Sequence, residues 1–498
     1  MNDLATLAHI VTSRGLATLP LFHAPAELGG KESQLVDVLV SGTAPTEVQV
    51  VKALYGAATP ANKVALRRLK SRVQTKLLNH LYFFNHDDPR HLVSRRHQMA
   101  CLALLHKGTA LYTEGEYVLS QRLLHRGLAE AQAGEFTTYA VQCGRLLATI
   151  YAQLVKPQEY ARLEPQLQNA LRVLHLEEEA EQLYTRSFLR VAGPVKVRTA
   201  FLPSMPGIIQ QLEGLHRRAK SFNTFWLLYR LRMIHAELQG NFLEIIRLTT
   251  AAARQLKQGR LNARRFDLRF NAHMNVVAYV HERQPAKGLR VAREGIALFA
   301  PTSSNWFSFQ EYHLLLALYG QQYAYAQQLL HEVGLNPALA KLRPAAVERW
   351  DLYRGYLHFA APPPAPRRAT PAPQWALVLP DFSRDKQGRN VAILVLQLLN
   401  HLRQHHLDEV LVRLERLRKY QQRHLLQDKA QRSRLFLRLL RILVDAGFDA
   451  AKARLRGQAT LDTLAQTPMP GDAFAEIEII PYEHLWELAL QPPPPGQG

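Results

Sequence analysis

Two histidines four residues apart are the first residues in this chain whose types and spacing could do chemistry. His401 and His405 occur in a stretch that is predicted to be helical, and His406 and Asp408 follow closely. A spacing of four places two imidazoles on one face of a helix, where they can ligate a transition metal. The chain contains 21 histidines, so one such pair is also expected by chance. We therefore expect no metal site here.

Two further clusters of ionisable side chains have simpler explanations. Residues 86–91, His-Asp-Asp-Pro-Arg-His, include metal-ligating types, but Asp-Asp-Pro is typical of a helix end and a turn. Four acids stand out in a basic chain and are expected near the start of a helix, where they complement the helix dipole. A docking spot for a basic partner is the alternative. The four acids are Glu177, Glu178, Glu179 and Glu181.

The local signatures of common enzymes are absent from the sequence. There is no G-x-x-x-x-G-K-S/T, no G-x-G-x-x-G, no G-x-S-x-G and no H-E-x-x-H, and His331-Glu332 lacks the second histidine of the last motif. This argues against nucleotide-dependent and zinc-protease chemistry, and less strongly against catalytic groups that converge only in three dimensions. We expect a protein that is not an enzyme and holds no cofactor.

The most concentrated charge lies at residues 63–76, inside a helix predicted over 61–84. This stretch holds six basic side chains and no acid, opposite an apolar stripe formed by Leu66, Leu69, Val73 and Leu77. Together with helices predicted at 31–41 and 45–55, it could form a helix-turn-helix-like module with a recognition helix. A basic face that is merely solvated is the alternative. The candidate anion contacts are Lys63, Arg67, Arg68, Lys70, Arg72 and Lys76.

Composition limits the class of protein. The chain has 498 residues, 47% apolar and 21% charged, which excludes wholesale disorder and fibrous classes. Its net charge of +21 favours nucleic acid, an acidic protein or an anionic membrane surface as partner, although compositional bias alone also explains it. The two cysteines exclude a disulfide framework. No apolar run approaches the roughly 18 residues that span a bilayer, and no signal peptide is evident, so we expect a cytoplasmic protein without membrane insertion.

Helix formers dominate almost everywhere from residue 45 onward, and Gly and Pro interrupt them at short intervals. Apolar residues recur with spacings of three and four, which indicates helices of about 12–18 residues. Only residues 375–379 and 477–480 alternate with a period of two, as short extended segments do. The predicted fold class is all-α.

Turns followed by an aromatic or apolar residue recur at intervals of about 42 residues, or about twice that. Two helices per interval form a hairpin that cannot bury both of its faces, so neighbouring hairpins must stack. The spacing therefore predicts an α-solenoid of stacked antiparallel helical hairpins. The marker residues are Tyr117, Tyr160, Phe242, Gln284, Tyr323, Leu407 and Phe448.

The stretch 108–127 resembles a tetratricopeptide unit. Gly108 is the small residue of its first helix, Leu111 is the large apolar residue three positions on, and Gly115 with Tyr117 forms a Gly-x-Tyr turn. The units are longer than the roughly 34 residues of the family, and the closing proline is missing after the first unit.

The frame recurs more loosely at Tyr160, at Gly240 with Phe242 and, by spacing, at Tyr323. The resemblance implies a superhelix whose concave face binds a protein or peptide, and it assigns packing positions only. We expect Tyr117, Tyr160, Phe242 and Tyr323 to be largely buried between adjacent hairpins.

The expected organisation has five parts: a helical cap at 1–95, a repeat array at 96–360, a proline-rich linker with a short extended segment at 361–387, C-terminal repeats at 388–490 and a disordered tail at 491–498. We expect a non-catalytic scaffold or adaptor. The alternative is a regulatory or defence protein that binds nucleic acid through its basic helix.

Overall fold

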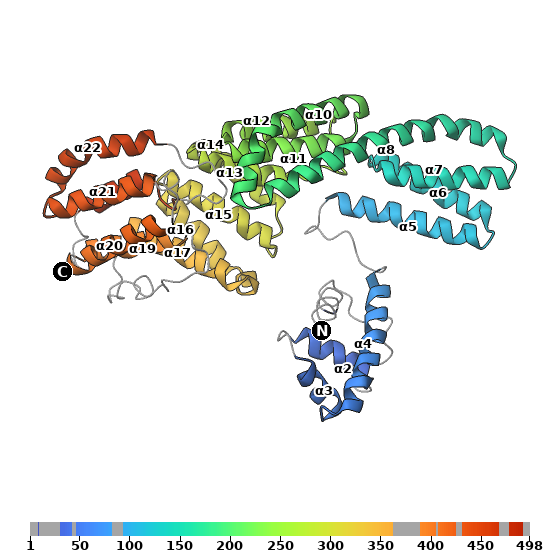
Figure 1. The fold of residues 1–498 in the computed structure, drawn as a ribbon, viewed down its shortest axis with the longest axis horizontal. Helices are drawn as coiled ribbons and strands as arrows, with labels where there is room; N and C mark the ends of the chain where they lie inside the picture. Colours follow the sequence, from blue (N-terminus) through green and yellow to red (C-terminus); the bar gives the residue numbers. More distant parts are fainter. Residues whose placement is uncertain are drawn as a thin grey trace. The chain divides into compact units, whose positions relative to one another are not determined.

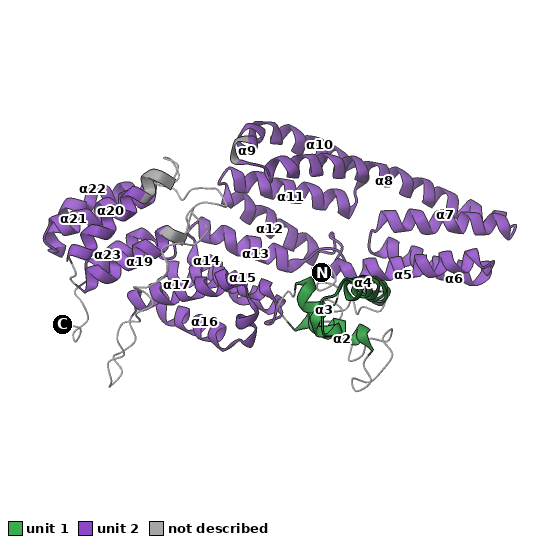
Figure 2. Ribbon diagram, turned by 60° about the horizontal axis from the view of Figure 1, so that its bottom comes forward, with its two compact units in different colours: residues 1–91 green, residues 92–498 purple. Residues whose placement is uncertain are grey.

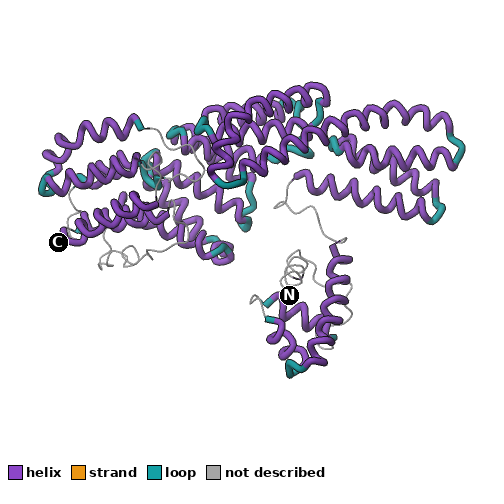
Figure 3. Tube along the Cα trace, viewed as in Figure 1, coloured by secondary structure: helices purple, strands orange, loops and turns teal. Residues whose placement is uncertain are grey.

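The computed structural model describes residue 8 and residues 30–41, 46–81, 93–361, 389–404, 407–424, 431–467 and 478–491. Within these ranges the chain is almost wholly helical and contains no strand (Figure 3), which confirms the all-α class. Residues 375–379 lie outside the described ranges. Residues 478–480, which belong to the second stretch with a period of two, do not form a strand.

The chain forms two compact units, residues 1–91 and residues 92–498 (Figure 2). The first unit contains α2 (Lys31–Val40), α3 (Glu47–Tyr55) and α4 (Pro60–His80). The helices predicted at 31–41 and 45–55 are confirmed to within two residues, whereas α4 ends four residues before the predicted position.

Local sequence explains where these helices begin. The Thr46 side chain accepts a hydrogen bond from the backbone N–H of Gln49, and the Gln49 side chain accepts one from the N–H of Thr46. This reciprocal capping box satisfies two N–H groups that an α-helix leaves unpaired at its start. Thr59 caps α4 in a similar way, and Pro60 occupies the first helical position, where its missing N–H costs nothing.

The predicted apolar stripe of α4 forms the core of the first unit. Leu66, Leu69, Val73 and Leu77 are each at most 1% exposed. They pack with the apolar faces of α2 and α3, and burying each such side chain contributes about 1.5–3 kcal/mol. The opposite face of α4 is thereby fixed toward solvent.

The second unit is a long succession of helices. In chain order they are α5 (Val93–Thr113), α6 (Tyr117–Ala133), α7 (Thr137–Gln153), α8 (Pro157–Val191), α9 (Val195–Phe201), α10 (Met205–Ala219), α11 (Phe222–Leu238), α12 (Phe242–Lys257), α13 (Leu268–His281), α14 (Pro285–Gly295), α15 (Ser304–Tyr319), α16 (Tyr323–Leu335), α17 (Pro344–Ala360), α19 (Arg389–Arg403), α20 (Leu407–His424), α21 (Gln431–Asp445), α22 (Ala450–Gln466) and α23 (Tyr482–Ala489).

Consecutive helices of the second unit pack against one another. Figure 1 shows α5, α6, α7 and α8 side by side, and the short turns that join them make neighbours antiparallel. With 35 residues, α8 is about 52 Å long, so its first part packs on α7 and its later part on α10 and α11.

The turns between these helices share one backbone geometry. Positive φ angles occur at Gly115 (81°), Glu135 (52°) and Val155 (53°), at intervals of 20 residues. After each, a backbone N–H donates to the carbonyl five residues earlier, which is the bond of the Schellman motif that ends many helices. The same combination recurs at Gly240, Arg283 and Gln321.

The close approach of α5 and α6 depends on Gly108. The Ser120 hydroxyl of α6 donates to the Gly108 carbonyl at 2.7 Å. A Cβ atom at position 108 would lie 2.8 Å from the side chain of Leu124, nearer than a real Cβ contact allows. Gly108 is therefore a packing position between two helices.

The aromatic marker residues are less buried than predicted. Phe242 is 4% exposed, Tyr117 and Tyr323 are half-buried, and Tyr160 is 41% exposed. The prediction of burial is right for Phe242 and wrong for Tyr160. The reason is the helix start: α8 begins at Pro157, so Tyr160 lies three residues into the helix, where its hydroxyl donates to Glu164 at 3.3 Å.

The regions 96–360 and 388–490 are predicted as separate repeat regions, but their helices share one apolar core. That core contains buried residues from α13 through α17 and from α19 through α23. Residues 362–388 between these regions, which include most of the predicted linker, and 492–498 of the predicted tail lie outside the described ranges. No described helix combines the length and the apolar character that crossing a membrane requires.

Candidate functional site

The predicted basic face of α4 divides into free and paired cations. Arg72 donates to Glu32 of α2 at 3.3 Å, and Lys76 donates to the same carboxylate at 2.5 Å. The hydrogen bond from Lys76 lowers the pKa of Glu32. The other four predicted contacts have no carboxylate of the described residues within ion-pair distance. They are Lys63, Arg67 and Arg68, which are exposed, and Lys70, which is half-buried.

The helices that carry this face are joined as in helix-turn-helix modules. Four residues, 56–59, separate α3 from α4, and Gly56 has a φ of 82°. Short glycine-containing turns of this kind join the two helices of such modules. Lys63 and Arg67 lie in the first two turns of α4, the part of a recognition helix that contacts base edges.

A groove in the second unit is the larger candidate site. Its volume is about 360 Å³, and its walls come from α6, α7, α8 and the turn between α10 and α11. Small residues open it: Ala131, Ala140, Gly144 and Ala170 line it where longer side chains would fill it. Aliphatic side chains line its apolar part, including Leu163 and Leu167, whereas its polar lining includes Gln132, Gln166, Asn169 and Lys220.

A polar network fixes the turn between α6 and α7 at the edge of this groove. The Glu135 carboxylate accepts from the backbone N–H of Phe222 at 2.8 Å and from the Asn262 amide at 3.1 Å. Arg265 donates to the carbonyl of Glu135 at 2.7 Å and lies between two aromatic rings, 4.3 Å from the centre of Phe136 and 4.7 Å from that of Phe222. The groove is thus preformed by rigid contacts.

The four predicted acids at 177–181 differ in their surroundings: Glu177 belongs to this network, whereas Glu178, Glu179 and Glu181 are exposed. All four lie in the middle of α8, so the prediction that they occupy a helix start is wrong. Glu177 is buried, accepts from the Thr137 hydroxyl at 3.0 Å and from the Asn223 amide at 2.8 Å, and so links α8 to α7 and α11. This carboxylate is a packing link and is not available to a basic partner.

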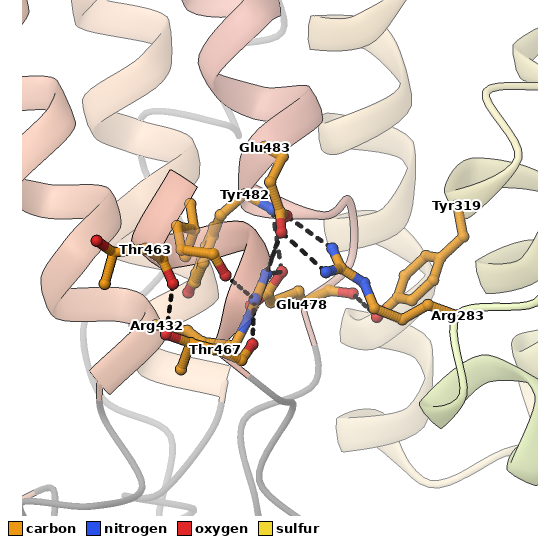
Figure 4. A network of polar contacts seen from close by, with 9 residues as sticks. Arg283, Tyr319, Arg432, Thr463, Thr467, Glu478, Tyr482 and Glu483 are labelled. Carbon is orange, nitrogen blue, oxygen red and sulfur yellow. Dashed lines mark hydrogen bonds and ion pairs between the residues drawn. The ribbon is translucent and has the colours of Figure 1, made fainter. Parts of the chain in front are cut away.

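Among the described residues, the least exposed charged side chains are Arg432 and Glu478, and Figure 4 shows the polar contacts around them. The Arg432 guanidinium donates to Glu478 at 2.5 Å, to Glu483 at 2.9 Å and to the carbonyls of Leu464 and Thr467 at 2.6 and 2.7 Å. Arg283 donates to the other side of Glu483 at 2.6 Å. We call Arg283, Arg432, Glu478 and Glu483 the arginine–glutamate cluster.

The electrostatics of the arginine–glutamate cluster are those of a structural link. Burial alone would raise the pKa of Glu483, but hydrogen bonds and charges from Arg283 and Arg432 outweigh it and lower the pKa to about 2. Burial opposes the charge of Arg432, yet both glutamates outweigh it and raise the pKa of that guanidinium. Two cations and two anions balance within the cluster, which joins α21, the end of α22, the start of α23 and the turn before α14.

The histidine pair is only half described. His401 is buried in α19, and His405 lies outside the described residues, as does the segment 86–91. Among the residues that the structure describes, no three His, Cys, Asp or Glu side chains are grouped to hold a metal ion. Cys101 and Cys143 are both free and buried, and burial raises the pKa of each thiol to about 11.

No family model matches the chain, and neither a curated protein nor a solved structure matches it.

Proposed function

We propose that this chain is a non-catalytic scaffold or adaptor, and that its second unit is a superhelical array of tetratricopeptide-like hairpins. The recurring turn geometry supports this architecture, because turns of similar geometry give the helices that they join a similar relation to one another. The second helix of a pair begins at 117, 157, 242, 285, 323, 407 and 450, in keeping with the marker spacing of the sequence.

The groove of α6, α7 and α8 is the proposed peptide site, and it is the single observation that carries the proposal. An extended peptide needs partners for its backbone amides and a recess for a side chain. Gln132 donates to Gln166 at 3.3 Å and Asn169 accepts from Arg172, and the remaining amide groups of these three side chains offer both donors and acceptors. The apolar lining that includes Leu163 and Leu167 offers the recess for an aliphatic side chain.

A variant in which a larger side chain fills the groove tests this proposal. Peptides selected from a random display library on the wild-type chain should lose binding to Ala170→Phe by at least tenfold, because the new ring occupies the groove. Ala161→Phe is the matched control, since Ala161 lies exposed on the same helix outside the groove and adds the same ring. Peptides that bind both variants as tightly as the wild type would contradict the proposal.

A second function is favoured by one specific observation, the four cations of α4 that have no acidic partner among the described residues. We propose as the alternative that the first unit binds nucleic acid through this face. On duplex DNA each neutralised phosphate changes the slope of log K against log salt by about −0.9. Replacing Lys63, Arg67 and Arg68 by Ala should therefore flatten the slope by about three.

The control for this alternative removes equal charge elsewhere. Arg122, Arg126 and Arg145 are exposed on α6 and α7, and their replacement by Ala should leave the salt slope unchanged. A dissociation constant for duplex and single-stranded oligonucleotides weaker than about 100 μM near 0.1 M salt would retire the alternative.

A further inference from the structure

A second cavity lies in the C-terminal part of the second unit, apart from the peptide groove. Its volume is about 280 Å³, and α17, α19, the α21–α22 turn and α23 enclose it. Among the described residues that line it, all are apolar except Arg403 and Gln491. The apolar residues that line it are Phe359, Leu399, Leu402, Leu443, Phe448, Ala450, Leu488, Ala489 and Leu490.

Arg403 carries an unbalanced charge into this apolar lining. Its guanidinium lies 4.0 Å from the centre of the Phe359 ring. No carboxylate of the described residues is within ion-pair distance, and burial lowers the pKa of the guanidinium. The carbonyl groups at the end of α19 and the face of the ring supply only partial negative charge.

Several partly buried arginines of the same unit are balanced by carboxylates, whereas Arg265 is held by backbone carbonyls and the Asn223 amide oxygen. Arg283 and Arg432 bind Glu483, and Arg349 binds Glu311 at 3.0 Å. Removing a cation from water is costly unless an anion accompanies it. Arg403 has neither kind of oxygen partner among the described residues, so an external anion would gain from binding there.

We propose that this cavity binds a monoanionic amphiphile, a carboxylate on a single saturated chain, with the carboxylate on Arg403 and the chain among the leucines. The cavity volume limits the chain length. A methylene group occupies about the volume of a liquid water molecule, roughly 30 Å³, so about 280 Å³ holds about nine such groups. The shape and charge of the site thus fit a fatty acid of medium length.

The test uses nonanoate and its neutral counterpart 1-nonanol as probes, titrated calorimetrically into the full-length chain. Nonanoate should bind with a stoichiometry of one. It should bind about 10–100 times more tightly than 1-nonanol, because a hydrogen bond to a charged group contributes about 1.5–3 kcal/mol. Arg403→Gln should reduce the affinity for nonanoate to that for the alcohol and leave the affinity for the alcohol unchanged.

Two variants separate the cavity from general surface charge. Arg441→Gln removes an exposed cation from α21 and should not change the affinity for nonanoate. Ala489→Phe fills the cavity and should abolish binding of both probes, while an unchanged helical circular dichroism spectrum shows that the chain still folds.

Three results would overturn the proposal. The first is an equal affinity of nonanoate for the wild type and for Arg403→Gln. The second is binding of several nonanoate molecules that Ala489→Phe does not reduce. The third is a peptide with a C-terminal aliphatic residue that binds at least tenfold more tightly than nonanoate. The last result would assign the cavity to a protein C-terminus.

Discussion

The basic face of α4 and the arginine–glutamate cluster use the same kind of charge in opposite ways. On α4, Lys63, Arg67 and Arg68 are exposed and have no acidic partner among the described residues. In the cluster, Arg432 has a side chain only 4% exposed and saturates its donors with carboxylates and carbonyls. Water solvates the first set, whereas the second must be solvated by protein. The number of basic residues therefore overstates the cationic surface that an anionic partner can reach.

The planar guanidinium explains why arginine serves in the cluster. It presents five N–H donors in a rigid fork that matches carboxylate geometry, which an ammonium group cannot do. Arg432 uses this fork to contact segments that lie far apart in sequence, and Arg283 and Glu483 are 200 residues apart. The cluster is accordingly a tertiary link.

The largest expected effect is on the cluster itself. Arg432→Met should lower the free energy of unfolding of the second unit by about 3–5 kcal/mol, because it leaves the buried Glu478 carboxylate without a cation. Urea unfolding followed by tryptophan fluorescence measures this, since every tryptophan of the chain lies beyond residue 91. Arg68→Met on α4 is the control and should change little. If the free energy of unfolding falls by less than about 1 kcal/mol, the cluster contributes no more than a surface ion pair does.

Acid should destabilise the second unit in two stages. Burial lowers the pKa of His273, His281 and His313 from 6.5 to about 4. Between these values the unfolded chain binds protons that the folded chain does not, so stability falls as pH drops from 6.5 to 4.

The second stage belongs to Glu483, whose folded pKa of about 2 lies below its ordinary 4.5. Its contribution, about 3 kcal/mol at 1.4 kcal/mol per pH unit, is present above pH 4.5 and disappears as pH falls toward 2. Urea midpoints measured from pH 7 to pH 2 test both stages. His281→Phe should flatten the first stage only, because a phenyl ring keeps the stacking on Phe242 at 4.1 Å. If His281→Phe loses as much stability between pH 6.5 and 4 as the wild type, protonation of His281 does not contribute to the first stage.

A smaller effect is expected at a turn. Val155 is β-branched, 82% exposed and holds a φ of 53°, a conformation that costs an L-residue roughly 1–2 kcal/mol. Val155→Gly should stabilise the second unit by about 1 kcal/mol after the added flexibility of the unfolded chain is counted. Gly115→Val, the reverse change at the equivalent turn, should destabilise it. If the midpoint temperatures of thermal unfolding of both variants shift in the same direction, the two turns do not share one geometry.

The smallest effect is expected on α4. Replacing Lys63, Arg67 and Arg68 by Ala should change the stability of the first unit by less than about 0.5 kcal/mol, as for most surface substitutions. Leu69→Ala, on the buried face of the same helix, should cost about 2–5 kcal/mol. Urea unfolding followed by circular dichroism compares the two. A large loss in the triple variant would mean that these cations support the fold.

The fold class and many helix starts could be predicted because their signals are local. The capping residues Thr46 and Thr59, the glycine at Gly115 and the apolar stripe of α4 each act within a few residues. The exposure of Tyr160 was missed because it depends on which residue begins α8. A start at Pro157 instead of Tyr160 rotates that ring out of the helix contact.

The candidate sites could not be predicted in the same way. The peptide groove depends on small residues from three helices that become neighbours only after packing. Nothing near Arg403 or Arg432 in the sequence distinguishes an arginine without a partner from one that contacts two glutamates. For the peptide groove, the sequence offered one signal, which is the presence of small residues on helix faces that otherwise carry leucine.

The shared turn geometry has a consequence for how such a chain can change in length. The helices α6 and α8 begin 40 residues apart, and each follows a turn of the same shape. If residues 117–156 were deleted, α8 would follow α5 directly, and it would run in the direction that α6 takes in the full chain. Deleting 137–156 alone would remove one helix and reverse the course of everything that follows. Insertions and deletions in this region should therefore be inherited in pairs of helices, so the number of helices keeps its parity.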